Sequence, residues 1–424
     1  MRISFLAALA TLTAAGPAAA GGFQVNLAAA KNIGMGHVGT GLALDQGSIF
    51  FNPGALAFVQ NRGVQLGVAG ALARTAYRSE AGQDFTFKHP TATPFNLYAA
   101  FGPKGEGDKP GRFAAGIGIY TPFGAALDYG TAWTGRYSLS KIVLLSGFIQ
   151  PTVSYQVTEW LGIGGGFVFG VGYVDLQRVL PVTNQLGTTA TLKLESESAA
   201  RGYGFNAGIY LKPTEMVSVG VSYRSQVNMK VKGGKVSTSN LPSDPVIRAN
   251  FAGTTFDATL PLPSTLSVGV GITPTEKLTL GFDANFTGWS AYKSLDFDFN
   301  GKVGGSLTSS SVRKYQNSYT LRAGGQYRAL DALTVRLGGY SDQSPVRDGY
   351  VTPETPDANR YAGTAGASLH LGKKFEVDLA YEFLVFKQRS QTQEQLVANG
   401  TTDRVAGTYQ TYINVGALGV HYKF

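Results

Sequence analysis

Residues Tyr412–Phe424 carry the pattern that most restricts how this chain can fold. Their side chains alternate with a period of two, and most even-numbered positions are apolar or aromatic, which predicts a strand with one apolar face. Because the sequence ends at Phe424, the strand has no later neighbour. We therefore expect it to pair with an early strand and close a sheet.

The first twenty residues have the pattern of an export signal. Arg2 precedes an apolar stretch over residues 3–15, and small residues at 18–20 form a cleavage site before Gly21. The stretch is too short to span a bilayer as a helix, for which about 20 residues are needed, and no later stretch is long enough. We expect residues 1–20 to be a signal peptide.

The composition favours many strands with aromatic girdles. Glycine (56 residues), phenylalanine (25) and tyrosine (21) are abundant, whereas charged residues make up 15%. The chain has no cysteine, so a disulfide framework is excluded. The formal net charge is +9, but the basic residues are dispersed in an exported chain, which argues against nucleic acid as a partner. We expect the cationic surface to contact outer-membrane lipid and anionic glycolipid.

Alternating segments recur through the chain. Val217, Val219 and Val221, for example, are separated by Ser218 and Gly220. The pattern predicts about fourteen strands, near residues 63–77, 94–102, 112–128, 142–158, 161–178, 201–212, 216–232, 258–273, 277–292, 313–328, 333–341, 360–371, 375–388 and 406–424. Most are as long as the roughly 9–11 residues that a tilted membrane strand needs.

The connections between these strands alternate strictly between short turns and long polar loops. Residues 158–160, 212–215 and 372–374 are examples of the short turns. This asymmetry is typical of an outer-membrane barrel, in which both termini lie on the periplasmic side. A soluble sandwich is the alternative. In lipid no strand edge can stay unpaired, so we expect an all-β, closed transmembrane antiparallel β-barrel in the outer membrane of a Gram-negative bacterium.

Residues 21–62 lack the alternation and are rich in small residues. About fourteen strands enclose more space than side chains fill, so we expect this segment to form a plug (hatch) in the lumen of a barrel made by residues 63–424. Gly34, Gly36 and Gly39 match the GxGxxG pattern of dinucleotide sites. The flanking strand and helix are missing, so we interpret them as close packing of the plug against the wall.

Several motifs then resemble one known family. They are Gly22-Phe23-Gln24-Val25-Asn26, the glycine run at 34–41, Phe51-Asn52-Pro53-Gly54-Ala55-Leu56, and the segments 202–208 and 222–225. Residues 22–424 resemble the FadL (OMPP1/FadL/TodX) family of outer-membrane long-chain fatty acid transporters. The resemblance implies a fourteen-stranded barrel plugged by an N-terminal hatch, and passive uptake of a hydrophobic small molecule. Long-chain fatty acids are the expected substrate, and aromatic hydrocarbons are the alternative.

The strand near residues 142–158 is apolar on both faces in its loop-side half. Ile142, Leu144 and Phe148 lie on one of these faces. A two-faced apolar stretch near the outer mouth fits the wall of a hydrophobic ligand pocket. Packing against the plug or an inserted loop is the alternative.

A fatty acid carboxylate buried in a barrel needs a cationic partner. Arg178 has the parity of an inward-facing residue, and the resemblance implies that it binds the head group. The family's second cation, a lysine, falls on Gln316, and Lys314 lies two residues away with the same parity. This departure leaves open a less anionic ligand, such as an aromatic hydrocarbon.

Pro122, Phe123 and Gly124 interrupt the third expected strand, because proline cannot donate to a ladder and glycine frees the backbone. The resemblance implies an inward bend here that opens the wall sideways; a simple bulge is the alternative. It also implies hatch roles for Phe23 and for the turn Asn52-Pro53-Gly54.

The sequence argues against an enzyme. The histidines His37, His89, His370 and His421 are not placed beside a nucleophile and an acid at the outer rim, and we expect no catalytic residue, cofactor or metal. A general porin is a remaining rival, but porins line their lumen with charge and this chain is sparing with it. We expect a monomer.

Overall fold

The computed structural model describes residues 21–60, 62–87, 91–103, 105, 111–182, 189–196, 199–401 and 403–424. The expected signal peptide lies outside these residues. Among the described residues, no helix is long and apolar enough to cross a membrane. The helices are short: α1 (Ala30–Ile33), α2 (Ser48–Phe51), α3 (Pro245–Ala249), α4 (Gln393–Ala398), and the 3-10 helices η2 (Pro53–Phe58) and η3 (Trp289–Ala291).

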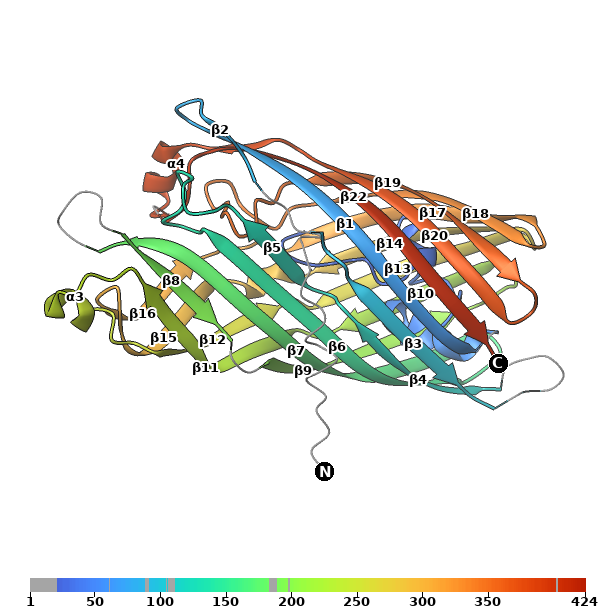
Figure 1. Ribbon diagram of the computed structural model, residues 1–424. Coiled ribbons are helices and arrows are strands. Elements are labelled where there is room, and N and C mark those ends of the chain that lie inside the picture. Colours follow the sequence, from blue (N-terminus) through green and yellow to red (C-terminus); the bar gives the residue numbers. More distant parts are fainter. Residues whose placement is uncertain are drawn as a thin grey trace.

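The rest of the fold is one antiparallel sheet (Figure 1). Its strands are β1 (Gly63–Ser79), β2 (Asp84–Thr86), β3 (Phe95–Phe101), β4 (Phe113–Tyr120), β5 (Gly124–Asp128), β6 (Lys141–Gln156), β7 (Leu161–Pro181), β8 (Thr189–Glu195), β9 (Ala200–Leu211), β10 (Val217–Arg224), β11 (Val227–Ser239), β12 (Thr255–Leu262), β13 (Thr265–Thr275), β14 (Leu278–Thr287), β15 (Ser294–Val303), β16 (Ser306–Val312), β17 (Ser318–Leu330), β18 (Leu333–Asp342), β19 (Arg360–Leu371), β20 (Phe375–Phe386), β21 (Arg389–Gln391) and β22 (Gly407–Lys423).

The sheet closes on itself. Hydrogen-bonded neighbours lead from β1 through β3, β4, β6, β7, β9, β10, β13, β14, β17, β18, β19 and β20 to β22. β22 pairs with β1 over its whole length, from Gly63 opposite Lys423 to Ser79 opposite Gly407. The expectation that the last strand closes the sheet onto the first is therefore confirmed. The expected count of about fourteen spanning strands stays a prediction, because several strands continue one another past a break.

Three expected strands are each divided in two. The strand expected near 112–128 is β4 and β5, that near 216–232 is β10 and β11, and that near 258–273 is β12 and β13. The first and third breaks contain Pro122 and Pro263, which lack the N–H group that a ladder needs. The short outer strands β8, β15 and β16 were not predicted from the sequence. Only β16 lacks alternation, since β8 and β15 have alternating apolar residues, such as Leu295, Phe297 and Phe299, in segments expected to be long loops.

Polarity alternates across the wall as expected. In β20, Phe375, Leu379 and Tyr381 are 49–52% exposed, whereas Glu376 and Asp378 are buried. The outside of the barrel therefore carries the apolar band that lipid requires, and the inside carries the polar groups.

The two ends of the barrel differ (Figure 1). Phe424 lies at the end with short turns, such as those between β6 and β7, between β9 and β10, and between β19 and β20, while α3 and α4 lie at the opposite end. The connection between β3 and β4, residues 102–112, is longer than the other turns at the Phe424 end, so the alternation of loop lengths is not strict.

Residues 21–60 lie inside the barrel and are almost all buried. α1 contacts β1, β19, β20 and β22, whereas η2 contacts β4, β6, β7, β9 and β10. These two groups of strands are on different sides of the ring, so the segment crosses the lumen between them. We call it the N-terminal segment.

Inward-facing glycines allow the N-terminal segment to approach the wall. A Cβ atom added at Gly208 would overlap the Asn52 side chain, and one added at Gly324 would overlap the Met35 carbonyl. On the segment itself, a Cβ at Gly36 would lie 2.7 Å from the Ala323 carbonyl oxygen, and Gly36 has a φ of +65°. The interpretation of the glycine run as close packing against the wall is confirmed for Gly34 and Gly36, whereas a Cβ at Gly39 would meet Phe51 and Asn32 of the segment itself.

Replacement of Gly208 by Ala should therefore loosen the N-terminal segment. Overpacking of this kind costs about 1–3 kcal/mol, so we expect a lower unfolding temperature in detergent and faster proteolysis within residues 21–60. Gly363→Ala in β19 is the matched control, because its Cβ would meet no atom within 4 Å. Equal unfolding temperatures for the two variants would contradict the packing argument.

Candidate functional site

An apolar cavity of about 90 Å³ lies inside the barrel, in the half away from Phe424. It is bounded by β5, β6, β7, β11, β12 and β15, by the loop at 352–355 and by Phe23 of the N-terminal segment. Almost all of its lining is apolar, including Ile142, Leu144, Met229, Val231, Leu260 and Phe297. Cavities with such walls stay dry and accept hydrocarbon ligands.

Two of the three apolar residues predicted at the pocket are brought together there. Ile142 and Leu144 line the cavity. Phe148 is fully buried but is not among the lining residues. Its ring instead packs against those of Tyr120 and Phe123, with centroids 6.0 and 6.2 Å away. Phe148 therefore contacts Phe123, which lines the cavity, without lining the cavity itself.

Phe23 closes one side of the cavity within an aromatic cluster. Its ring meets Trp289 edge-on at 4.9 Å and Tyr292 at 5.7 Å between centroids, and Phe123 lies 6.0 Å away. Gly22 makes this possible, because it has a φ of +70° and its missing Cβ would lie 2.8 Å from the Trp289 ring.

The break between β4 and β5 is completed by the N-terminal segment. Val25 donates its N–H to the Pro122 carbonyl (2.7 Å), and Gly124 donates to the Phe23 carbonyl (3.0 Å). The predicted irregularity at Pro122, Phe123 and Gly124 is thus present, but its backbone groups are paired with residues 23–25 rather than left open. This pairing satisfies polar groups at a place where the neighbouring ladder ends.

A second cavity of about 30 Å³ lies on the other side of Phe23. Its lining includes Ala73 and Thr75 of β1, and Gly124 and Leu127 of β5. The ladder of β3 with β1 stops at Val68, and that with β4 stops at Tyr120, so no named strand joins β1 to β5 beyond that level. Among the described residues, an isolated Ala71–Ala92 bridge covers this part of the wall.

Arg313 is the cation at the larger cavity, and sequence reasoning missed it. It is buried, lies 3.4 Å from the Glu354 carboxylate, and its Nε donates to the Tyr292 hydroxyl at 3.3 Å. Burial alone would lower the pKa of Arg313, but Tyr292 and Glu354 raise it, so the guanidinium stays charged. Arg313 is the first residue of the strand expected near 313–328, and it has the opposite parity to Lys314 and Gln316. The regular strand β17 begins only at Ser318, so parity did not predict the direction of these side chains.

The other predicted polar contacts lie elsewhere. Arg178, Lys314 and Gln316 are not among the residues that line the cavity. Lys314 has a φ of +46° and is exposed, with its Nζ 5.6 Å from the centre of the Tyr350 ring. Arg178 is partly buried, and its Nε has no hydrogen-bond partner in the described part of the chain.

The predicted turn at Asn52, Pro53 and Gly54 is formed and held against the wall. The Asn52 side chain accepts from Gly54 N (3.0 Å) and donates to the carbonyls of Thr40 (2.9 Å) and Ile209 (3.0 Å). It therefore caps η2 and ties it to β9. A Cβ at Gly54 would lie 2.7 Å from the Gly208 carbonyl oxygen, which gives glycine a packing reason at this position.

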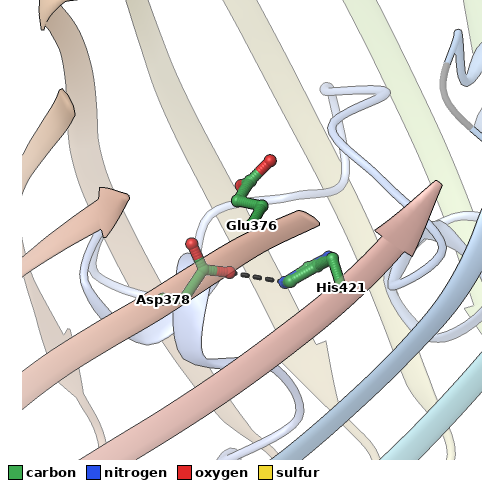
Figure 2. Close-up of side chains that lie close together, drawn as sticks. All are labelled: Glu376, Asp378 and His421. Atoms are coloured by element: carbon green, nitrogen blue, oxygen red, sulfur yellow. Dashed lines mark hydrogen bonds and ion pairs between the residues drawn. The ribbon is translucent and has the colours of Figure 1, made fainter. Parts of the chain in front are cut away.

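Buried charges fix the N-terminal segment to the wall near the Phe424 end. Figure 2 shows Glu376 and Asp378 of β20 beside His421 of β22, whose Nε2 lies 2.5 Å from Asp378. One ligand atom from each of the three residues would fit around a metal ion. Cations of the chain already lie against them: Lys31 is 2.8 Å from Glu376, and Arg336 is 3.5 Å from Asp378.

This cluster is therefore balanced by the chain's own cations rather than arranged for a metal. Lys31 also lies 3.0 Å from Asp45. Burial alone would lower the pKa of the Lys31 ammonium, but Asp45, Asp378 and Glu376 raise it. A second buried contact between the N-terminal segment and the wall joins His37 to Glu382 of β20 at 2.9 Å. Neither this contact nor the cluster around Lys31 offers a nucleophile beside a base.

The sequence matches the family model described as "Outer membrane protein transport protein (OMPP1/FadL/TodX)" over residues 11–424. The chain is 26% identical to Haemophilus influenzae outer membrane protein P1 over 74% of this chain and 72% of that protein. It is 24% identical to a 47 kDa outer membrane protein of Pasteurella multocida, over 99% and 98%. A long-chain fatty acid transport protein of Salmonella typhi is 22% identical, over 64% and 66%.

Two solved structures have the same fold. A Pseudomonas aeruginosa FadL homologue aligns with a TM-score of 0.80 and 21% identity, covering 95% of this chain and 100% of its own. The toluene transporter TbuX of Ralstonia pickettii aligns with a TM-score of 0.64 and 18% identity, covering 93% and 98%. These likenesses concern the closed antiparallel barrel.

Proposed function

Because the chain belongs to the OMPP1/FadL/TodX family of outer membrane transport proteins, we propose that it takes up long-chain fatty acids passively. The family is one of transport proteins rather than enzymes. The observation that carries the proposal is the apolar cavity closed by Phe23 beside the interrupted wall at Pro122. A hydrophobic solute gains more from such a dry site than from a water-filled pore.

The proposal includes the organisation of the chain. Residues 1–20 are the signal peptide, residues 21–62 the plug, and residues 63–424 a monomeric barrel whose fourteen-membered circuit of strands spans the membrane. Support for the plug comes from the burial of the N-terminal segment and its contacts with different sides of the ring. Support for the barrel comes from its closed ladder and apolar outer face.

A fatty acid would place its chain in the cavity and its carboxylate at Arg313. The guanidinium is already charged and faces the cavity, where Glu354 now holds it. A ligand carboxylate would compete with Glu354 for the same donors. Arg178, with its unpartnered buried Nε, is proposed as a second contact for the head group. An aromatic hydrocarbon, the second candidate ligand, would use the apolar walls alone.

Replacement of Arg313 by Gln should weaken binding of a long-chain fatty acid about ten- to hundredfold, the scale of a charge-assisted hydrogen bond. The alcohol of the same chain length should bind nearly as before. Both affinities can be measured by fluorescence displacement on purified protein.

The matched control is the double variant Arg313→Gln and Glu354→Gln. Because Glu354 is also neutralised, this variant has no buried carboxylate left without its cation. It should also bind the fatty acid more weakly than the wild-type protein does, and the alcohol nearly as before. Equal losses for acid and alcohol in both variants would favour an uncharged ligand.

The two cavities suggest a lateral route. They share Phe23, Ala125, Glu354 and Thr355 in their linings, so movement of Phe23 would join them. The smaller cavity lies behind the wall between β1 and β5, where the described pairings of β1 at this edge are the isolated Ala71–Ala92 bridge and then the short ladder with β2. We propose that the ligand leaves there into the bilayer, which spares an apolar molecule from entering water.

Filling the smaller cavity should separate binding from uptake. We expect Gly124→Phe to reduce uptake of labelled fatty acid by cells about tenfold while ligand affinity in detergent stays within about twofold, because the filled space lies outside the main cavity. Gly124→Ala is the control, since its Cβ would be 3.3 Å from the Leu144 carbonyl oxygen and 3.8 Å from Val25. Normal uptake by the Phe variant would rule out this exit.

Two carboxylates near the nitrogens of Gly21 and Gly22 support cleavage of the chain before Gly21. The Gly21 nitrogen lies 3.1 Å from the Asp342 carboxylate, and the Gly22 nitrogen lies 3.1 Å from Asp357. Arg360 is the guanidinium paired with both carboxylates. Burial raises the pKa of Asp357 above its usual range, although Arg360 opposes the shift. A free ammonium at Gly21 would supply the further positive charge that two buried carboxylates favour.

The mass of the protein from outer membranes should therefore correspond to a chain that begins at Gly21. Two alanines inserted before Gly21 should lower the unfolding temperature at pH 7 by a few degrees, through loss of about 1 kcal/mol. Pairing raises the pKa of the amino group, so this advantage of the natural terminus should be full below about pH 8 and shrink as pH rises. A chain that retains residues 1–20 would disprove the cleavage.

A further inference from the structure

A row of hydrogen-bond donors on the outer surface takes no part in the proposed pathway. Arg201 of β9 lies directly opposite Lys230 of β11, and Lys230 lies opposite Thr259 of β12. All three residues are exposed. Opposite residues of an antiparallel pair have Cβ atoms about 5 Å apart, so a guanidinium, an ammonium and a hydroxyl lie side by side across three strands.

Arg201 and Lys230 face the membrane, whereas Thr259 is exposed and also borders the internal cavity. Met229 and Val231, on either side of Lys230 in the chain, line the internal cavity, so Lys230 projects from the other face of the strand. On the same face as Arg201, the next two side chains towards the Phe424 end are Tyr203 and Phe205, which are 61% and 50% exposed. Exposed aromatic rings mark the boundary between hydrocarbon and head groups.

The charge of the row is not balanced by the protein. Like charges directly opposite each other destabilise a strand pair, yet no carboxylate of the described chain pairs with Arg201 or Lys230. Nearby carboxylates already have other partners. Glu195 lies 2.8 Å from Lys193 and accepts the Tyr173 hydroxyl at 2.6 Å.

The next acidic groups are also engaged. Asp257 lies 2.6 Å from Lys232. Asp175 lies 3.9 Å from both Lys141 and Lys193. An external anion is therefore the missing partner of the row.

We propose that Arg201, Lys230 and Thr259 bind a phosphate group of an outer-leaflet glycolipid. Arginine, lysine and a hydroxyl are suitable donors for a phosphate. The acyl chains of the same lipid would then lie along Tyr203 and Phe205, which a free phosphate ion would leave uncovered. The two cations of the site, Arg201 and Lys230, do not line the cavity proposed for the transported substrate.

Native mass spectrometry of the purified full-length protein in non-ionic detergent tests this assignment, with diphosphorylated lipid A as the probe. Lipid A from which both phosphates have been removed is the matched ligand. Wild-type protein should retain the diphosphorylated form about tenfold more strongly, and the double variant Arg201→Gln and Lys230→Gln should lose most of this preference.

The control variant is Lys277→Gln with Arg328→Gln, which removes the same charge from an exposed pair of positions at the Phe424 end. It should keep the preference. Equal losses in both double variants, no preference in the wild-type protein, or complete displacement of the lipid by excess inorganic phosphate would each overturn the proposal. The comparison of the two lipids on wild-type protein holds even if a variant fails to fold.

Discussion

The ladder between β1 and β22 is the interaction on which the rest of the structure depends. A sheet in lipid cannot leave an edge unpaired, and these two strands pair from Gly63 opposite Lys423 to Ser79 opposite Gly407. Closure creates an interior that side chains alone do not fill. The N-terminal segment occupies part of that interior, and the apolar cavity occupies another part. The positions of the N-terminal segment and of the cavity therefore both follow from how the enclosed space is divided.

Two physical devices hold the N-terminal segment in place. Wall positions without a Cβ atom, such as Gly208 and Gly324, let its backbone approach closely. Buried ion pairs, such as that of Lys31 with Glu376, then fix its position. A buried pair contributes modest net stability but is costly to break on one side. These contacts therefore make the placement of the segment specific, which matters because Phe23 belongs to it.

Local patterns were sufficient for the break at Pro122 and the turn at Asn52, because each depends on neighbours in the sequence, and alternation repeated along the whole chain was sufficient for the closed barrel. An apolar stretch on both faces of the strand expected near 142–158 also placed Ile142 and Leu144 at the cavity. Period-two alternation could not find Arg313, because it placed this residue on the opposite face to Lys314 and Gln316 of the strand expected near 313–328, whereas β17 begins only at Ser318. Nor could it foresee the pairing of residues 23–25 with the break, since contacts between distant, non-alternating segments leave no periodic signal.

The break between β4 and β5 is hydrogen-bonded to the N-terminal segment, and these bonds determine the free-energy cost of opening the wall there. Opening requires loss of the bonds from Val25 to Pro122 and from Gly124 to Phe23, and each buried group left unpaired costs about 1–3 kcal/mol. A ligand can shift such an equilibrium only if it interacts differently with the two states. Phe23 supplies that difference, because its ring lines both cavities while its carbonyl holds the break. In the proposed lateral route, a ligand that displaced the ring would therefore strain the bond that closes the wall, and one residue would join binding to release.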